Sequence, residues 1–83
     1  MHLTKFVKFR EEKFGGVLFE TRSEKVFTLT PTAAAVVREI VAGAAAAEIA
    51  PRLAARFEAP SGTIEREVET FLAEMRAKGL VQD

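Results

Sequence analysis

Carboxylates are the side chains of this sequence best suited to do chemistry, and two groups of them stand out. Glu11 and Glu12 are adjacent, while Glu65, Glu67 and Glu69 alternate with other residues. A general acid or base or an activated nucleophile needs a partner, and no His, Cys or Ser–Lys arrangement accompanies these groups. We interpret both groups as solvated faces of a strand and a helix, and we expect no catalysis by this chain.

Residue types that hold metals and phosphates are scarce as well. The chain has no Cys, and its one His is His2, in a terminus that we expect to be loose. Disulfides and thiolate zinc sites are therefore excluded, and an imidazole metal site is not expected. Gly15 and Gly16 fit neither GxGxxG nor GxxxxGK[ST], so they do not form a phosphate loop. We predict no cofactor and no metal.

Charge and length limit the partners further. Twelve basic residues balance 12 acidic ones; residues 1–43 carry seven Lys or Arg and five Glu, and residues 44–83 carry five and seven. A neutral chain has no strong non-specific attraction for nucleic acid or for an anionic membrane. The 83 residues suit a single domain over residues 1–83. Without an apolar signal or spanning segment, we expect a cytoplasmic protein.

The elements that must position any site begin with strands. Residues 6–12, 17–21 and 26–29 mix β-branched and aromatic residues with polar ones, as strands with one wet face do. The segment Lys13-Phe14-Gly15-Gly16 supplies two glycines for a turn or bulge, and residues 22–25 form a connection of hairpin length. We predict a three-stranded antiparallel meander with residues 17–21 at its centre. In the last strand Phe27 and Leu29 face the core, and Val26 and Thr28 face away.

Helices fill the rest of the chain. Thr30 and Pro31 form a strong helix start, because Thr caps free amides and Pro at the first position loses no bond. This helix runs to Gly43, with one apolar stripe composed of Ala33, Val36, Val37, Ile40 and Val41. A second helix spans residues 44–57, lacks a good cap, and contains Pro51, which should delay or kink its first turn.

The last helix follows a break at residues 59–62, with Ser61 as its expected cap, and ends at Gly79. We expect Leu80 and Val81 to pack back or to add a short extended piece. One face of the helix carries the apolar residues Ile64, Val68, Phe71, Leu72 and Met75. Strands followed by helices predict an α+β fold.

Without an active site, function must come from a surface, and three interpretations stay open. A winged helix could bind DNA through its last helix, but four acids (Glu65, Glu67, Glu69, Glu74) outnumber three bases (Arg66, Arg76, Lys78) there. A small winged-helix DNA-binding regulator is therefore the alternative. The strand at 26–29 could instead offer an edge to an extended peptide, or Lys25 or the last helix could block that edge. An edge-paired homodimer is the third possibility.

Several local patterns together resemble a known family over about residues 6–81. They are Val26-Phe27-Thr28-Leu29 followed by Thr30-Pro31-Thr32-Ala33-Ala34; Glu48-Ile49, Leu53 and Ala54-Ala55-Arg56-Phe57; and Val68, Phe71-Leu72, Met75 and Gly79-Leu80-Val81. The chain resembles the PqqD-like domains, whose namesake is coenzyme PQQ biosynthesis protein D and which are known as RiPP recognition elements (RiPP, a ribosomally made and then modified peptide). It departs from their pattern at Ala45 and Pro51.

The resemblance implies a winged-helix-like fold and a role as a peptide-binding chaperone. In the family, the leader segment of a precursor peptide adds as a strand beside the third strand and rests against the third helix. The chaperone also contacts a modifying enzyme, often a radical S-adenosylmethionine (radical SAM) enzyme, whose cofactor belongs to that enzyme. No nucleic acid or membrane partner is implied.

Carried over to this chain, the resemblance assigns backbone pairing to Lys25, Val26, Phe27, Thr28 and Leu29. The last helix forms the opposite wall, and helical geometry gives that helix two flanks. One holds Glu67, Phe71, Glu74 and Lys78; the other holds Leu72 with Glu65, Glu69 and Arg76. We favour the first flank as the wall of the peptide site.

Overall fold

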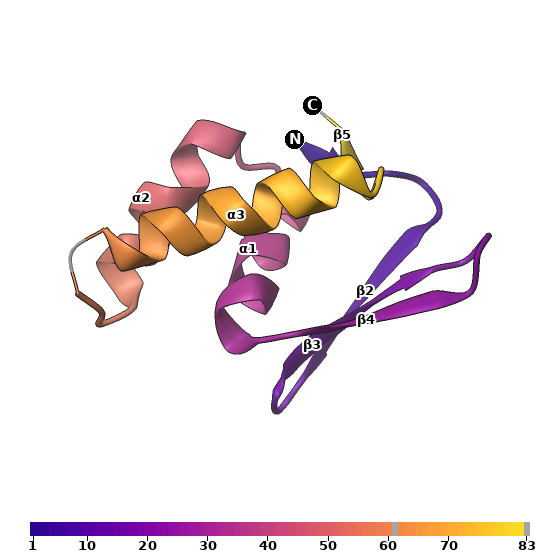
Figure 1. Ribbon diagram of the computed structural model, residues 1–83, viewed down its shortest axis with the longest axis horizontal. Coiled ribbons are helices and arrows are strands. Elements are labelled where there is room, and N and C mark those ends of the chain that lie inside the picture. Colours follow the sequence, from indigo (N-terminus) through magenta and orange to yellow (C-terminus); the bar gives the residue numbers. More distant parts are fainter. Residues whose placement is uncertain (61, 83) are drawn as a thin grey trace.

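The computed structural model describes residues 1–60 and 62–82 and confirms the α+β fold (Figure 1). Its main sheet consists of β2 (Val7–Glu12), β3 (Gly15–Glu20) and β4 (Lys25–Leu29). The strands are antiparallel in the order β2-β3-β4. The central strand is therefore β3, as predicted, and β4 lies at an edge.

The register of the sheet sets which side chains face the helices. Phe9, Leu18 and Phe27 are cross-strand partners and share one face, whereas Phe19 and Val26 are partners on the other. Leu18 is fully buried, but Val26 is 61% exposed. The helices cover only the face of Leu18 (Figure 1), so the predicted orientation of Phe27 and Val26 is confirmed.

The first turn lies in the expected segment but is made by its first two residues rather than by the glycines. The reversal occurs at Lys13 and Phe14, and both glycines already belong to β3. Gly15 has a φ of +143°, and a Cβ built there would lie 2.2 Å from the carbonyl oxygen of Leu29. Glycine is needed here because the start of β3 passes directly against the end of β4.

Helix α1 (Pro31–Val41) begins as predicted. The Thr30 hydroxyl accepts a hydrogen bond from the Ala33 N–H at 3.1 Å, and Pro31 takes the first helical position. The predicted apolar stripe is partly wrong, because Val41 is 62% exposed. The fully covered residues of α1 are instead Ala34, Ala35, Val36, Val37 and Ile40.

The wide buried arc of α1 follows from its central position. The helix contacts β3 and β4 on one side and α2 (Ala46–Arg56) and α3 (Thr63–Ala77) on the other. In Figure 1 it lies between the sheet and the other two helices. The small side chains of Ala34 and Ala35 allow neighbouring elements to pack closely on both sides of α1. A single apolar stripe would bury only one side of the helix.

Helix α2 begins two residues later than predicted and runs on past Pro51, which lies in its second turn. No side chain of Ala45 caps it; instead the Ala45 N–H donates to the Glu48 carboxylate at 2.8 Å. Ile49 and Leu53 are buried against the rest of the core.

A small ion-pair network joins α1 to α2. Glu39 accepts hydrogen bonds from Arg52 at 3.0 Å and from Arg56 at 3.3 Å. The hydrogen bond with Glu39 is the main reason that the pKa of the Arg52 guanidinium is raised above its ordinary value. Exposed pairs of this kind contribute little stability individually, so the core rather than the network holds the helices together.

Helix α3 presents the predicted face to the core. Ile64, Val68, Leu72 and Met75 are buried, and Phe71 is half-buried at the edge of that face. The expected cap at Ser61 lies outside the described residues.

The two ends of the chain pair with each other. β1 (His2–Leu3) and β5 (Val81–Gln82) form a small antiparallel sheet, and the Thr4 N–H donates to the carbonyl oxygen of Leu80 at 3.0 Å. The expectation of a loose N-terminus was wrong, because the chain after α3 packs back and gives the first residues a partner. That return of Leu80 and Val81, both buried, is confirmed.

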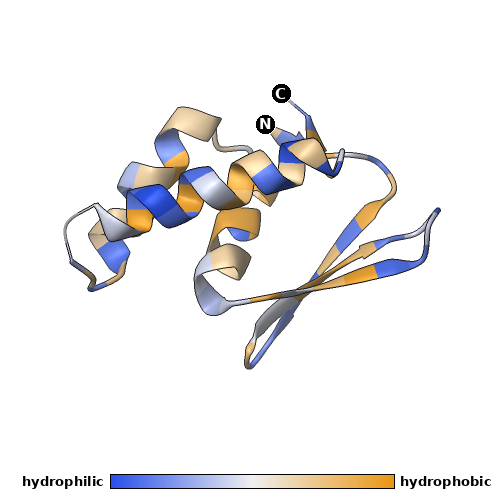
Figure 2. Cartoon of the chain, viewed as in Figure 1, coloured by the Kyte–Doolittle hydropathy of each residue, from blue (hydrophilic) through white to orange (hydrophobic). Residues whose placement is uncertain are grey.

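Hydropathy is distributed as expected for helices and strands that share one core. Figure 2 shows hydrophobic and hydrophilic residues alternating along α3 and along the sheet strands. Within residues 1–60 and 62–82, no helix is long and apolar enough to cross a membrane.

Candidate functional site

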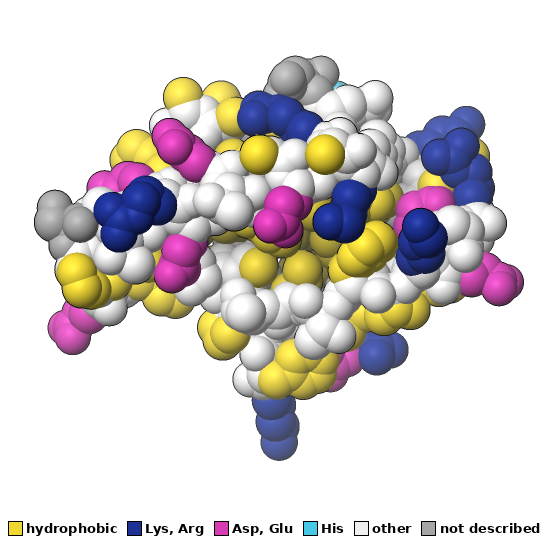
Figure 3. All heavy atoms as spheres, viewed as in Figure 1, with side chains coloured by type: hydrophobic (Ala, Val, Ile, Leu, Met, Phe, Trp, Pro, Cys, Tyr) yellow, Lys and Arg dark blue, Asp and Glu magenta, His cyan; other side chains and the backbone are white. Residues whose placement is uncertain are grey.

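A groove runs between the edge strand β4 and helix α3. It consists of three hollows of about 580, 110 and 300 Å³. The first two share Phe71 and Glu74, and the last two share Phe27 and Lys78, so the hollows are continuous. The space-filling view shows this hollow below α3, with hydrophobic atoms at its base (Figure 3).

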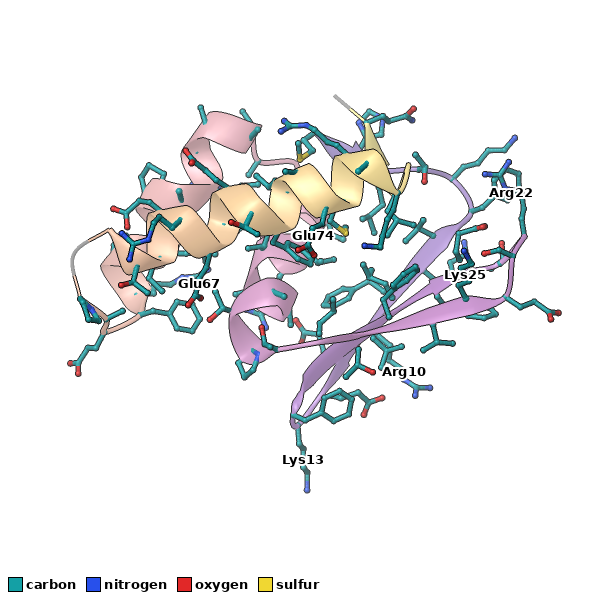
Figure 4. All side chains as sticks on the ribbon, in the orientation of Figure 1. Arg10, Lys13, Arg22, Lys25, Glu67 and Glu74 are labelled. Atoms are coloured by element: carbon teal, nitrogen blue, oxygen red, sulfur yellow. The ribbon has the colours of Figure 1, made fainter. Side chains whose placement is uncertain are left out.

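The largest hollow lies at the C-terminal end of β4, where the chain enters α1. Its apolar walls come from Leu29 of β4, Val36 of α1 and Phe71 of α3. Glu67 and Glu74 are its charged lining residues, and both extend from α3 on the side that faces α1 and β4 (Figure 4). This end of the groove therefore combines an apolar surface with negative charge.

The opposite end of the groove carries positive charge. Lys25 and Lys78 line the 300 Å³ hollow, and the Lys78 Nζ lies 5.9 Å from the centroid of the Phe27 ring, within the range of a cation–π contact. The acid here, Glu20, is engaged by the hairpin turn. The Arg22 N–H at 2.8 Å is the main reason that the pKa of Glu20 is lowered, with a further contribution from Ser23.

The hydrogen-bonding phase of the sheet decides which backbone groups of β4 point into solvent. The Thr21 N–H donates to the Phe6 carbonyl oxygen at 2.9 Å, so this pair is a hydrogen-bonded one, and such pairs alternate along an antiparallel ladder. On β3 this alternation directs the backbone groups of Phe19 toward β2 and those of Leu18 toward β4. The partner of Leu18 in β4 is Phe27, so these two residues form a hydrogen-bonded pair. The N–H and C=O groups of Val26 and Thr28 therefore point away from the sheet.

This arrangement is a template for one more strand. An edge strand with unpaired donors and acceptors can pair with an extended chain. The side chains of that chain would alternate between the groove and the far face of the sheet. Among the described residues, no group of three His, Cys, Asp or Glu could hold a metal ion.

The structure brings most of the expected site residues together. Eight of the nine line the groove: Lys25, Phe27, Thr28, Leu29, Glu67, Phe71, Glu74 and Lys78. The side chain of the ninth, Val26, lies on the far face of the sheet, although its backbone lies on the open edge. On the other flank of α3, Leu72 is buried in the core.

Sequence reasoning missed the contribution of α1. Thr32, Ala33 and Val36 form part of the largest hollow, as does Thr70 of α3. A signal was present, since the first turn of a helix that follows directly on an edge strand must lie beside the end of that strand.

A known protein family matches this chain over most of its length. The family model of coenzyme PQQ synthesis protein D (PqqD) matches residues 15–81, which confirms the resemblance; a comparison with curated proteins found no significant match. A solved structure of lasso peptide synthetase B1 complexed with the leader peptide has a TM-score of 0.81 at 23% identity, covering 99% of this chain and 96% of that one.

TbiB1 in complex with the TbiA(β) leader peptide has a TM-score of 0.83 at 21% identity, with 100% of both chains covered. At these identities the two structures show that the fold is shared. The family model, in contrast, matches the sequence itself over most of the chain. The chain therefore belongs to the coenzyme PQQ synthesis protein D family.

Proposed function

We propose that this chain is a recognition element that captures the leader segment of a ribosomally synthesised precursor peptide by β-strand addition. The observation that carries the proposal is the open edge of β4, where the backbone groups of Val26 and Thr28 point outward beside a groove. Family membership supports it, as do two fold neighbours whose solved structures contain leader peptides.

Binding would rest on main-chain hydrogen bonds and a few side-chain contacts. A leader strand bonds to the two N–H and two C=O groups of Val26 and Thr28, while alternate side chains enter the groove. Ordering a flexible peptide offsets much of this gain, so a Kd of about 1 μM is expected.

The chain itself performs no reaction in this proposal. It holds the precursor beside a modifying enzyme, which we propose to be of the radical SAM class, and raises the effective concentration of one for the other. Any cofactor is that enzyme's own.

Proline substitutions on the open edge test strand addition. Val26→Pro and Thr28→Pro each remove an outward N–H without removing a bond of the β3–β4 ladder, and the ring also obstructs an added strand. We expect each to weaken binding of a labelled leader peptide by about tenfold or more; candidate leaders are sought among short open reading frames that neighbour the gene of this chain. Fluorescence anisotropy measures the affinity, and circular dichroism checks the fold.

The other edge of the sheet provides the matched control. The N–H of Glu11 in β2 also points away from β3, by the same phase, so Glu11→Pro removes an outward donor far from the groove. Its exposed ion pair with Arg38 is a small loss. Binding by this variant should stay normal, and normal binding by both folded β4 variants would refute strand addition.

An amide NMR titration separates this function from DNA binding. Shifts at residues 25–29 and on α3 with the leader peptide support the proposal. Silence toward peptide, together with salt-sensitive shifts on adding random duplex DNA, would replace it with the winged-helix regulator.

A further inference from the structure

We infer that the peptide taken up by this groove carries a basic residue and, four positions toward its C-terminus, an acidic residue. This inference rests on the proposed function and adds the chemistry and direction of the ligand. Its basis is the charge sorting along the groove (Figure 4). Glu67 and Glu74 line one end, and Lys25 and Lys78 line the other. The carboxylate at the second end, Glu20, is held by hydrogen bonds from the hairpin turn.

Most charged residues that line the groove take no part in the ion pairs of the described residues. The ion pairs within the described residues engage other carboxylates, such as Glu39 with Arg52 and Glu11 with Arg38. Of the charged residues that line the groove, Glu20 pairs with Arg22. None of the ion pairs among the described residues involves the other four, which are Lys25, Glu67, Glu74 and Lys78. These side chains are thus placed to meet charges brought by a ligand.

The ladder phase fixes the spacing of the ligand's groove-facing residues. Peptide residues opposite Val26 and Thr28 form the hydrogen-bonded pairs, so their side chains share the far face of the sheet. Those opposite Leu29, Phe27 and Lys25 share the groove face, in pairs where side chains approach most closely. Each step between such positions is two residues.

The direction follows from the strands already present. The β2-β3-β4 sheet is antiparallel throughout, and antiparallel pairing is slightly more stable per residue than parallel pairing. An antiparallel peptide meets Leu29 first, then Phe27, then Lys25. The charge sorting along the groove is thereby converted into an order of residues along the peptide.

Each position has a matching side-chain chemistry. The hollow beside Leu29 has apolar walls and the carboxylates of Glu67 and Glu74, which suits the long apolar stem and cationic head of Arg or Lys. The middle hollow, of about 110 Å³, suits a small apolar side chain. At the far end, Lys25 and Lys78 suit Asp or Glu.

Selection from a library of random displayed peptides tests the inference even while the precursor is unidentified. Peptides of about twelve residues exceed the length of the edge and are selected on the immobilised full chain. Enriched peptides should share the order basic, small apolar, acidic at alternate positions. For one enriched peptide, an isomer with its two charged residues exchanged has identical composition and should bind about tenfold more weakly.

A charge exchange on the protein provides the reciprocal test. Glu74→Lys combined with Lys78→Glu keeps the net charge and should reduce the preference between the two isomers to within about twofold. The matched control exchanges two charges of α3 that do not line the groove, Arg66→Glu with Glu69→Lys. The control should keep the tenfold preference.

The outcomes separate this inference from the function on which it rests. Failure to enrich any peptide that shifts the amides of residues 25–29 would overturn both. Enriched peptides that shift those amides but bind equally well with their charges exchanged would leave strand addition intact and overturn the charge order alone.

Discussion

Gly15 is a residue at which β3 passes close to the start of α1. Besides the contact with Leu29, an added Cβ would lie 2.7 Å from the carbonyl carbon of Thr30 and 2.9 Å from the nitrogen of Pro31. Those three residues form the corner where β4 becomes α1, at the largest hollow of the groove. The absence of a Cβ at Gly15 therefore allows β3 to lie against this corner, beside one end of the site.

We expect Gly15→Ala to lower the free energy of unfolding by about 2–4 kcal/mol, because backbone atoms cannot yield as a flexible side chain can. Gly43→Ala is the control: Gly43 also has a positive φ, of +93°, but nothing lies within 4 Å of its added Cβ. Gly43→Ala should lower the free energy of unfolding by only about 1–2 kcal/mol. Urea unfolding measures both, and equal losses would contradict a destabilising close approach at Gly15.

Single residues also show where sequence-based prediction succeeds. The Thr30 cap and the Pro31 start depend on bonds within one turn of chain, and both could be predicted. The role of Gly15 depends on a strand end reached fourteen residues later, Leu29. Local chemistry could therefore be predicted, and this long-range approach could not.

At the scale of elements, the ability of β4 to accept an added strand depends more on the orientation of its backbone than on the identity of its side chains. Its N–H groups alternate between the β3 ladder and solvent, so one five-residue strand is at once part of the core and an open edge. No additional segment of the described chain pairs with it.

Hydrogen exchange of the free protein tests this alternation before any ligand is known. The amides of Phe27 and Leu29, bonded to β3, should exchange about a hundredfold or more slowly than those of Val26 and Thr28. Saturating leader peptide should slow the fast pair and leave the slow pair nearly unchanged. Comparable protection at all four positions in the free protein would contradict the assigned ladder phase.

Most of the elements could be predicted because each carries a period of its own, of two in the strands and 3.6 in the helices. β1 and β5 could not be predicted, since a strand of two residues shows no period. They form because the chain that follows α3 places Val81 beside Leu3. The wide buried arc of α1 was missed for a related reason: one stripe is the expectation for a helix packed on one side only.

The whole molecule decides which surface becomes the groove. From the sequence, either flank of α3 could line the groove, because the apolar face of the helix does not show on which side β4 lies. In the structure α1 packs between the sheet and the other two helices, and Glu67 and Glu74 rather than Glu65 and Glu69 line the hollow beside the edge strand. That choice belongs to tertiary structure.

The joined termini contribute to the stability of this arrangement. The Thr4 hydroxyl donates to the carbonyl oxygens of Gly79 at 3.1 Å and Leu80 at 3.2 Å. Thr4→Val keeps the shape and removes these bonds, so unfolding free energy should fall by about 1 kcal/mol. Thr70→Val, at an exposed helical position, should change it by less than about 0.5 kcal/mol. Equal effects in thermal or urea unfolding would show that the pairing of the termini through Thr4 contributes nothing.

The pairing of β1 with β5 has a practical consequence for linking this domain to other proteins. β1 and β5 lie side by side (Figure 1), and Leu80, just before β5, lines the end of the groove beside Lys25. An antiparallel leader would leave the groove at that same end. A catalytic domain fused through a short linker to either terminus would thus meet the emerging substrate at once, so single-chain fusions should tolerate both orders of the two parts.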